Sequence, residues 1–391
     1  MSSRFKVPFW FQSSSTRSLH FTCCGPFYAG KCVRRFTVDT FGTVFLQRIF
    51  SMSAAVGNLK WVLSSLLETD RQFVYHTNKA QLSDVSATRD GNVFKVRFDF
   101  EDKSDYSVVM KITKNDAESI FYENYSIPSE FPMPRYYGHL KNVLLMQNVD
   151  SFGAKQEFQV GLNKQKVYNL TAHLADLHGF HLISPASQAS ELPDSKPVTV
   201  EEFQKAAGKL PNLLSTKDVL LISAYLKFVP TTASDLKTVC VHGNFTSENV
   251  FWAKDELDHT SNRAAAVVGW SGVHLGSPTD DLAQLLISCV DPDERLFIQK
   301  DAVELYYNSL RSHLRQSDDL MSRFTLSRVL KCFKRSFVDQ TIKFIVKLSE
   351  FDSEKGADKA KGVAEAIRAK LEMRARFALM EARELILKMD L

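Results

Sequence analysis

The hydrophobic residues change their spacing along the chain, and this change constrains the fold more than any other feature. Residues 92–100 alternate strictly, with an apolar side chain at every second position and polar ones between them. A period of two predicts a half-buried β-strand. After Asp150 the apolar residues recur every three or four positions, which predicts amphipathic helices. We therefore expect an α+β protein with a small antiparallel sheet first and helices after it.

Further sheet elements are expected on both sides of residue 110. The polar turn EDKSD joins the alternating segment to a second strand over residues 106–112, which indicates a hairpin. Asn115, followed by Glu118 three positions later, predicts a capped helix through about residue 125. A loop with three prolines follows, and residues 142–146 predict another strand. Residues 57–67 predict a helix before the sheet.

Helical spacing dominates the second half of the chain. A core helix is predicted where apolar residues fall at three- and four-residue steps, namely at Val167, Leu170, Leu174, Leu177 and His178. Residues 187–197 are rich in Ser, Asp and Pro and predict a solvent loop, after which helices resume over 200–228. Two long helices are predicted at 324–351 and 359–388.

Two short apolar runs interrupt this helical pattern. Residues 249–253 and 264–268 are separated by KDELDHTSNR, which predicts a β-hairpin with an exposed tip. Ser277 then offers a helix N-cap, with Pro278 and Asp280 in the first turn. We expect that helix to continue to about residue 290.

Charge and cysteine content limit the class of protein. Residues 1–67 contain eight Lys or Arg and one acidic residue, Asp39, so the rest of the chain is slightly acidic despite the overall charge of +4. This balance argues against a nucleic-acid-binding surface in the body. No apolar run approaches the roughly 20 residues of a transmembrane helix. Cys240, Cys289 and Cys332 stand singly in apolar contexts, which predicts buried, reduced thiols in an intracellular protein.

The first 51 residues form a basic extension rich in Ser and Phe, which also contains Cys23, Cys24 and Cys32. Its composition resembles an organelle transit peptide, but a disordered tail or sequence upstream of a start at Met52 has the same features. The expected location is cytoplasmic, or mitochondrial if the extension is a transit peptide. We divide the chain into this extension (1–51), a sheet-containing part (52–150) and a helical part (151–391).

An ordered series of motifs carries a family resemblance. The motifs are VVMKI, ESIFYEN, PRYYGHLKNVLLMQNVD, LADLHGF, VHGNFTSENVFW, AAAVVGWSGVHLGSPTDDLAQLL and ELYYNSL. Together they resemble the CHK kinase-like (ecdysteroid kinase-like) family, which is similar to choline kinases and aminoglycoside phosphotransferases. The resemblance covers roughly residues 60–390. It implies a two-lobed protein-kinase-like fold, with a small antiparallel-sheet N-lobe, a mainly helical C-lobe, and binding of ATP and Mg²⁺.

The resemblance also implies which residues contact a nucleotide. Lys111 matches the family's nucleotide-contacting Lys, and Glu118 matches the helix Glu that pairs with it. Met146 and Gln147 match the hinge, where relatives carry an acidic pair and this chain carries neutral Gln and Asn. The phosphate-covering loop would lie in SDVSATRDGNVF. Its single glycine, Gly91, predicts a weak grip on a triphosphate.

The catalytic and metal-binding positions depart from the family pattern. His242 and Asn249 match the catalytic loop, but Asn244 stands where relatives have the Asp that handles the substrate hydroxyl. An amide cannot take a proton near neutral pH. Gly269 replaces the metal-binding Asp, so Asn249 alone would hold Mg²⁺ weakly. Glu248, one position away, is an alternative ligand.

The residues expected to support the fold are retained. His178 and Asp281 match the family's scaffold positions, and Asp281 is expected to hydrogen-bond to the catalytic-loop backbone. Loss of acidic groups on an intact scaffold predicts a pseudoenzyme that binds a small molecule or a protein partner without efficient phosphoryl transfer. The alternative is an active ATP-dependent kinase that phosphorylates a hydroxyl of an alcohol or steroid-like substrate through rearranged metal ligands.

Overall fold

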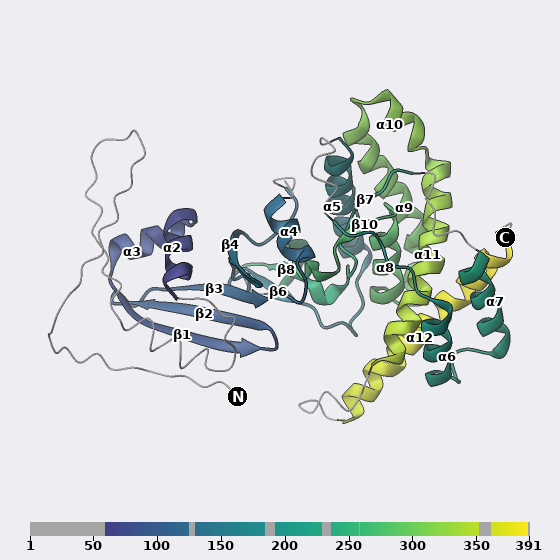
Figure 1. Cartoon of the computed structure of the whole chain (residues 1–391), viewed down its shortest axis with the longest axis horizontal. Coiled ribbons are helices and arrows are strands. Elements are labelled where there is room, and N and C mark those ends of the chain that lie inside the picture. Colours follow the sequence, from purple (N-terminus) through teal and green to yellow (C-terminus); the bar gives the residue numbers. More distant parts are fainter. Residues whose placement is uncertain are drawn as a thin grey trace. The chain divides into compact units, whose positions relative to one another are not determined.

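A computed structural model describes residues 59–124, 130–183, 192–228, 236–257, 259–351 and 361–389 (Figure 1). These residues form two compact units. The sheet unit contains the residues up to Ser119 together with Pro134–Asn148, and the helical unit contains Ile120–Met133 and the residues from Val149 onward. The predicted extension at 1–51 lies outside the described residues. The expected α+β class, with a small antiparallel sheet and a mainly helical remainder, is confirmed.

The sheet unit contains a five-stranded antiparallel sheet in the order β1-β2-β3-β5-β4. Its strands are β1 (Leu82–Asp90), β2 (Val93–Phe100), β3 (Asp105–Ile112), β4 (Tyr136–Leu140) and β5 (Val143–Gln147). The predicted hairpin is confirmed, because β2 pairs with β3 across the polar turn. The helix predicted before the sheet is present as α2 (Leu59–Thr69), and the one predicted after the hairpin is present as α4 (Ala117–Asn124), between β3 and β4.

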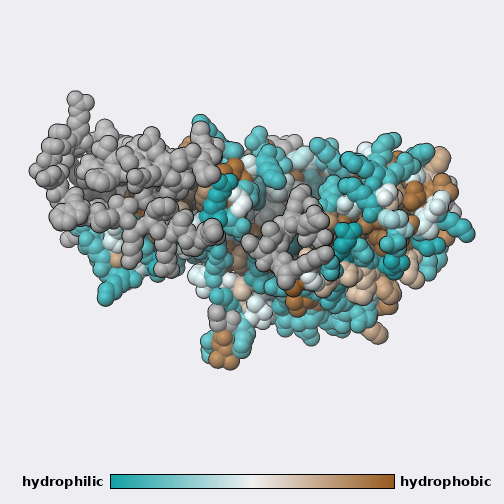
Figure 2. Space-filling model, turned by 90° about the horizontal axis from the view of Figure 1, so that it is seen from below, coloured by the Kyte–Doolittle hydropathy of each residue, from teal (hydrophilic) through white to brown (hydrophobic). Residues whose placement is uncertain are grey.

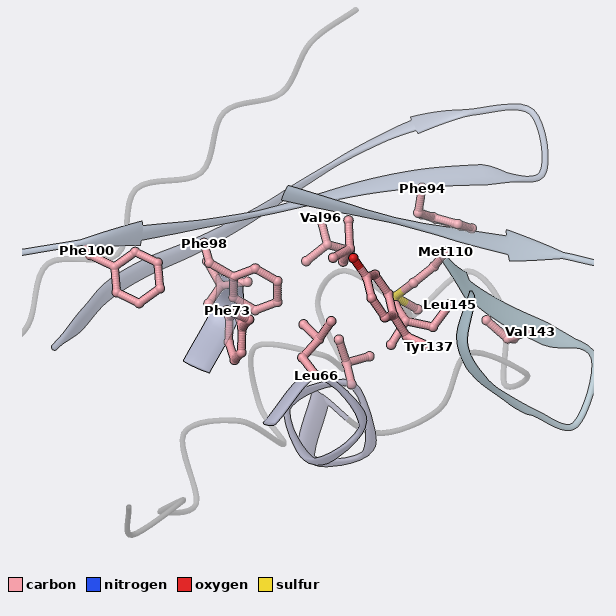
Figure 3. Close-up of a cluster of buried hydrophobic side chains, with 13 residues drawn as sticks. Leu66, Phe73, Phe94, Val96, Phe98, Phe100, Met110, Tyr137, Val143 and Leu145 are labelled. Atoms are coloured by element: carbon pink, nitrogen blue, oxygen red, sulfur yellow. The ribbon is translucent and has the colours of Figure 1, made fainter. Parts of the chain in front are cut away.

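The alternation in β2 places one face of the strand in the core of the sheet unit (Figure 3). Every second residue from Phe94 to Phe100 is buried, whereas Lys95 and Arg97 are exposed. Phe73 of α3 (Arg71–Lys79) packs against the Phe98 ring, with centroids 5.2 Å apart. Burying one such side chain contributes about 1.5–3 kcal/mol. A one-residue slip would expose this whole face, so the core fixes the register of β2.

Strand β1 is not among the elements that the sequence predicted. The segment expected to cover phosphates consists of most of β1, a two-residue turn and the start of β2. Within β1 only Val85 is buried, so the strand has almost no apolar alternation to reveal it. Gly91 occupies the turn with φ of +58°, a left-handed conformation that glycine adopts without strain.

The helical unit is built from long helices and short strands (Figure 1). Its helices are α5 (Lys164–Ile183), α6 (Val200–Lys209), α7 (Thr216–Phe228), α8 (Asp280–Cys289), α9 (Pro292–Leu314), α10 (Asp318–Arg323), α11 (Leu326–Ser349) and α12 (Lys361–Leu387). One sheet has the order β6-β8-β9, from β6 (Gly153–Lys155), β8 (Val250–Lys254) and β9 (Thr260–Val267). A second consists of β7 (Val239–Val241) and β10 (His274–Gly276).

The predicted helices of this unit are confirmed within a few residues. The five residues expected to face the core from α5 are all buried. Helices α6 and α7 occupy the expected range 200–228, and α11 and α12 match the two long helices near the C-terminus. The predicted hairpin is present as β8 and β9. The three cysteines of this unit are buried free thiols, as expected.

The predicted cap of α8 is wrong. The helix begins at Asp280, its N-cap is Thr279, and Thr279 makes no capping hydrogen bond through its side chain. The Ser277 hydroxyl instead lies 3.0 Å from the Ser336 hydroxyl of α11. This contact joins residues far apart in the sequence, and the local capping pattern gave no sign of it.

The predicted solvent loop at 187–197 is described only from Leu192 onward, and Leu192 is buried. Hydrophilic residues cover much of the described surface in Figure 2, with hydrophobic residues scattered among them. None of the helices in the described ranges is long and apolar enough to cross a membrane.

Candidate functional site

The loop predicted to be catalytic, residues 242–249, connects β7 to β8 through the short 3₁₀ helix Ser247–Asn249. Gly243 has φ of +74°, and a Cβ atom there would collide with the Gly272 backbone carbonyl and lie 2.9 Å from His274 Nδ1. Only glycine fits this close approach without strain. The loop is therefore held tightly against the turn that precedes β10.

His242 joins this loop to Val268, the residue that follows β9. Its ring is fully buried, and Nδ1 accepts a hydrogen bond from Asn244 N at 3.2 Å. With that role for Nδ1, Nε2 carries the proton and donates to the Val268 carbonyl at 3.0 Å. The ring also packs on Trp270, with centroids 4.4 Å apart. These contacts give His242 a structural role in the loop.

Asp281 fixes the loop backbone from α8. Its two carboxylate oxygens accept hydrogen bonds from His242 N at 2.7 Å and Gly243 N at 3.0 Å. The scaffold role expected for Asp281 is thereby confirmed. Burial raises the pKa of Asp281 to about 7, although the two backbone donors favour its charged form.

Asn244 is paired with a lysine that the sequence did not identify. Lys347 Nζ of α11 donates a hydrogen bond to Asn244 Oδ1 at 2.6 Å. Loss of solvent around the ammonium lowers the pKa of Lys347, and nearby Lys343 lowers it further, whereas Glu248 raises it. The amide oxygen at this position thus already accepts a bond from a cationic donor.

Gly269 and Asn249 occupy the expected metal-binding positions. Gly269 has φ of +84° and ψ of 39°. A Cβ atom built on Gly269 would overlap Asn249 Oδ1 and lie 2.8 Å from Asn249 Cγ. The Asn249 amide also donates from Nδ2 to the Asn244 carbonyl oxygen at 2.9 Å. The Asn249 side chain therefore fills the space that a longer side chain at 269 would enter.

The nucleotide positions predicted from the sequence lie in the sheet unit. Lys111 Nζ of β3 lies 2.6 Å from Glu118 Oε1 of α4, and the Glu118 side chain is completely buried. Glu118 Oε2 has no hydrogen-bond partner among the described residues. At the expected hinge in β5, the Met146 side chain is buried and Gln147 Oε1 accepts a bond from Arg135 N at 3.3 Å. The structure thus brings Lys111 and Glu118 together.

A cavity of about 550 Å³ opens beside the catalytic loop, wholly inside the helical unit. The loop supplies Asn244, Thr246 and Glu248 to its lining, and α11 supplies Lys343 and Lys347. The two lysines were missed because nothing in the sequence links α11 to a loop about a hundred residues earlier. Their four-residue spacing on one helix was the available signal.

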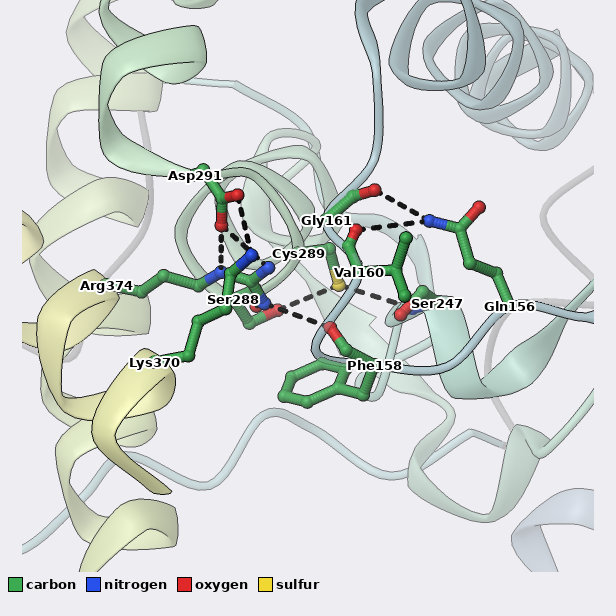
Figure 4. Close-up of polar contacts among 10 residues, drawn as sticks. All are labelled: Gln156, Phe158, Val160, Gly161, Ser247, Ser288, Cys289, Asp291, Lys370 and Arg374. Carbon is green, nitrogen blue, oxygen red and sulfur yellow. Dashed lines mark hydrogen bonds and ion pairs between the residues drawn. The ribbon is translucent and has the colours of Figure 1, made fainter. Parts of the chain in front are cut away.

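Part of the cavity wall, formed by Phe158 and Ser288, is held by Arg374 of α12, whose polar contacts are drawn in Figure 4. Its guanidinium is completely buried and forms an ion pair with Asp291 at 2.9 Å. Nη1 donates to the carbonyl oxygens of Phe158 at 3.2 Å and Ser288 at 2.7 Å. Because Phe158 and Ser288 both line the cavity, Arg374 sets the position of this wall.

Solved structures with some likeness to this chain include three phosphotransferases. Choline kinase from Cryptosporidium parvum has 11% identity and a TM-score of 0.48, with 78% of this chain and 90% of that chain covered. Plasmodium vivax ethanolamine kinase has 10% identity and a TM-score of 0.46, with coverage of 88% and 96%. ADP-bound aminoglycoside phosphotransferase APH(2'')-Ib has 13% identity and a TM-score of 0.38, with coverage of 79% and 99%.

A comparison with curated proteins finds no match. Residues 192–382 match the family model DUF1679, which carries the description "Uncharacterized oxidoreductase dhs-27". The matched range contains the catalytic loop, the Gly269 turn and the helices that line the cavity. This match, which spans just under half of the chain, supports the CHK kinase-like resemblance found from the motifs.

Proposed function

We propose that this protein is a pseudoenzyme that binds a small molecule or a protein partner and does not transfer phosphate efficiently. The observation that carries the proposal is the contact between Lys347 Nζ and Asn244 Oδ1. A general base for a substrate hydroxyl needs a free, proton-accepting group at hydrogen-bond distance. Asn244 offers an amide oxygen, and that oxygen already accepts a bond from an ammonium group.

The metal-binding positions support the same proposal. Mg²⁺ prefers carboxylate oxygens in octahedral geometry and binds weakly to neutral amides alone. Gly269 has no side chain, and the Asn249 amide is used within the loop by its bond to the Asn244 carbonyl. ATP and Mg²⁺ are thus implied by the family but poorly supported by the residues at these positions.

Restoring the two acidic groups tests this proposal. The double variant Asn244→Asp with Gly269→Asp should gain ATP binding that depends on Mg²⁺, measured by thermal shift, whereas the unaltered protein should not. Because a side chain at 269 would meet Asn249, the single variant Asn244→Asp serves as a control for folding. If the unaltered protein turns over ATP as well as the double variant does, the proposal is wrong.

The alternative function is an active small-molecule kinase, and one observation favours it. The ion pair between Lys111 and Glu118 is intact at 2.6 Å, and such a pair positions nucleotide phosphates in active kinases. Glu248 lines the cavity and would have to act as a metal ligand. The variant Glu248→Gln would then abolish ATP turnover, whereas the pseudoenzyme has no turnover to lose.

An oxidoreductase function, which the description of the matched family names, is not the one that we propose. Dinucleotide-binding folds place the cofactor at the ends of parallel strands. The strand ladders of the described residues are antiparallel.

A further inference from the structure

Two ammonium groups face the cavity from one side of α11. Lys343 and Lys347 are four residues apart, which places them one helical turn apart on the same face. Neither forms an ion pair within 4 Å of a carboxylate in the described part of the chain. Like charges at this spacing repel each other, so the pair is unfavourable without an anion nearby.

The lining of the cavity also contains buried apolar residues. Ile287 of α8, Phe344 and Leu348 of α11, and Leu371 of α12 line the cavity and are at most 9% exposed. Cavities of about 300–1,000 Å³ with apolar walls and a few polar groups are typical small-molecule sites. The volume of about 550 Å³ lies within this range.

We propose that this cavity binds an amphipathic organic anion, with its carboxylate or phosphate head at Lys343 and Lys347 and its apolar body against α8, α11 and α12. This inference rests on the proposed function, since it assigns a ligand class to a site that binds without phosphorylating. Asn244 adds a polar contact beside the head group. In a kinase of the resembled family, the carboxylate at position 244 would take the proton of the substrate hydroxyl. In this chain, position 244 carries a neutral amide next to the Lys347 ammonium group.

None of the described carboxylates that line the cavity forms an ion pair with Lys343 or Lys347. Glu202 also lines the cavity, but its Oε2 caps α6 by accepting from Thr199 N at 2.9 Å. Glu248 influences Lys347 without forming an ion pair with it. Lys343 also lines a neighbouring cavity of about 530 Å³ together with Asp280 and Asp339. Burial raises the pKa of Asp339, and the charge of Lys343 opposes that rise without an ion pair within 4 Å among the described residues. Glu350 and Lys196 also line the cavity, and like Lys347 and Glu248 they are exposed to solvent, where screening weakens the effect of distant charges.

Two further observations agree with an anionic ligand. The pKa of Lys347 is lowered by loss of solvent and by Lys343, and the opposite charge of a bound anion would raise it again by stabilising the ammonium form. Thr246 lines the cavity, and its buried Oγ1 has no hydrogen-bond partner among the described residues. An unpaired buried hydroxyl is unfavourable, so a ligand oxygen within its reach would stabilise the loop.

Calorimetric titration of the full chain with ten-carbon probes, without ATP and Mg²⁺, tests the proposal. Decyl phosphate and decanoate should bind at least about tenfold more tightly than decanol, since a hydrogen bond to a charged group contributes on this scale. Decyltrimethylammonium should bind more weakly than decanol. The tighter of the two anions identifies the head group. Equal affinity for the anions and decanol would overturn the proposal.

Variants separate a built site from general hydrophobic binding. Lys343→Met and Lys347→Met should each weaken decyl phosphate binding by about tenfold. The matched control Lys334→Met, on the exposed side of the same helix, should leave it unchanged. Asn244→Asp, which places a carboxylate beside Lys347, should also weaken it. Unchanged binding in Lys343→Met, Lys347→Met and Asn244→Asp would overturn the inference. ATP turnover by the unaltered protein would overturn only the proposed function.

Discussion

At the scale of single residues, Asn244 and Gly269 differ in how easily each could regain a carboxylate. Asp has nearly the same shape as Asn, and at 244 it would gain an ion pair with Lys347. At 269 the backbone is left-handed, and any side chain must displace the Asn249 amide. The two positions are thus unequal, and the metal-binding position is the harder one to restore.

The first prediction concerns this left-handed position. Gly269→Ala should destabilise the protein by about 1–3 kcal/mol, because alanine is strained at this φ and its Cβ meets Asn249. Urea denaturation, followed by a spectroscopic signal from the helical unit, measures the change in the free energy of unfolding. Gly208→Ala is the control, since Gly208 lies in α6 with open space at its Cβ. There alanine should stabilise by about 0.5–1 kcal/mol. Equal effects at the two sites would contradict the interpretation.

At the scale of elements, the contact between α5 and α9 contains a buried neutral histidine. His178 of α5 is fully buried, and its Nδ1 lies 2.7 Å from the Tyr306 hydroxyl of α9. Burial lowers the pKa of His178 to about 3. In the unfolded chain His178 takes up a proton near pH 6.5, whereas in the folded chain it stays neutral at that pH. Stability contributed by this group is therefore complete above about pH 6.5 and is lost as the pH falls toward 3.

The second prediction follows from this titration. The free energy of unfolding should fall by about 3 kcal/mol between pH 6 and pH 4 because of His178. His178→Gln should reduce that pH dependence, whatever it does to stability at pH 7. His259→Gln, at an exposed site of β-hairpin β8–β9, should keep the full dependence. A pH dependence in His178→Gln as steep as that of the unaltered protein would refute the assignment.

The third prediction concerns the attachment of α12. Arg374→Met would leave the Phe158 and Ser288 carbonyl oxygens without their shared donor, whereas Asp291 would keep its ion pair with Lys370. Leaving a buried acceptor without its donor typically costs about 1–3 kcal/mol. The loss should appear as a lower midpoint in urea denaturation. Arg376→Met, an exposed neighbour on the same helix, should change stability by less than about 0.5 kcal/mol. Similar losses in both variants would contradict a special role for Arg374.

At the scale of the whole molecule, the sequence predicted those helices and strands in which the buried residues recur at regular spacing. The β2–β3 hairpin and the long helices have one strongly apolar face, so their positions were evident. Strand β1 and helix α3 each bury a single residue, Val85 and Phe73, and left no such trace. Pattern reasoning depends on apolar periodicity, whereas β1 is held by its backbone pairing with β2, which leaves no such periodicity in its side chains.

The candidate site shows the same division. Motif spacing identified the catalytic loop, Gly269, and the Asp281 contact with the loop backbone. It did not reveal that Lys347 bonds to Asn244 or that Asn249 fills the space beside Gly269. These contacts depend on how α11 and the loops pack, which no residue pattern specifies.

The most direct test is calorimetric titration of the unaltered chain with ATP, with and without Mg²⁺. If these positions cannot anchor the metal, Mg²⁺ should change the affinity for ATP by less than about twofold, or ATP should not bind in either condition. An affinity that rises tenfold or more on addition of Mg²⁺ would contradict the account.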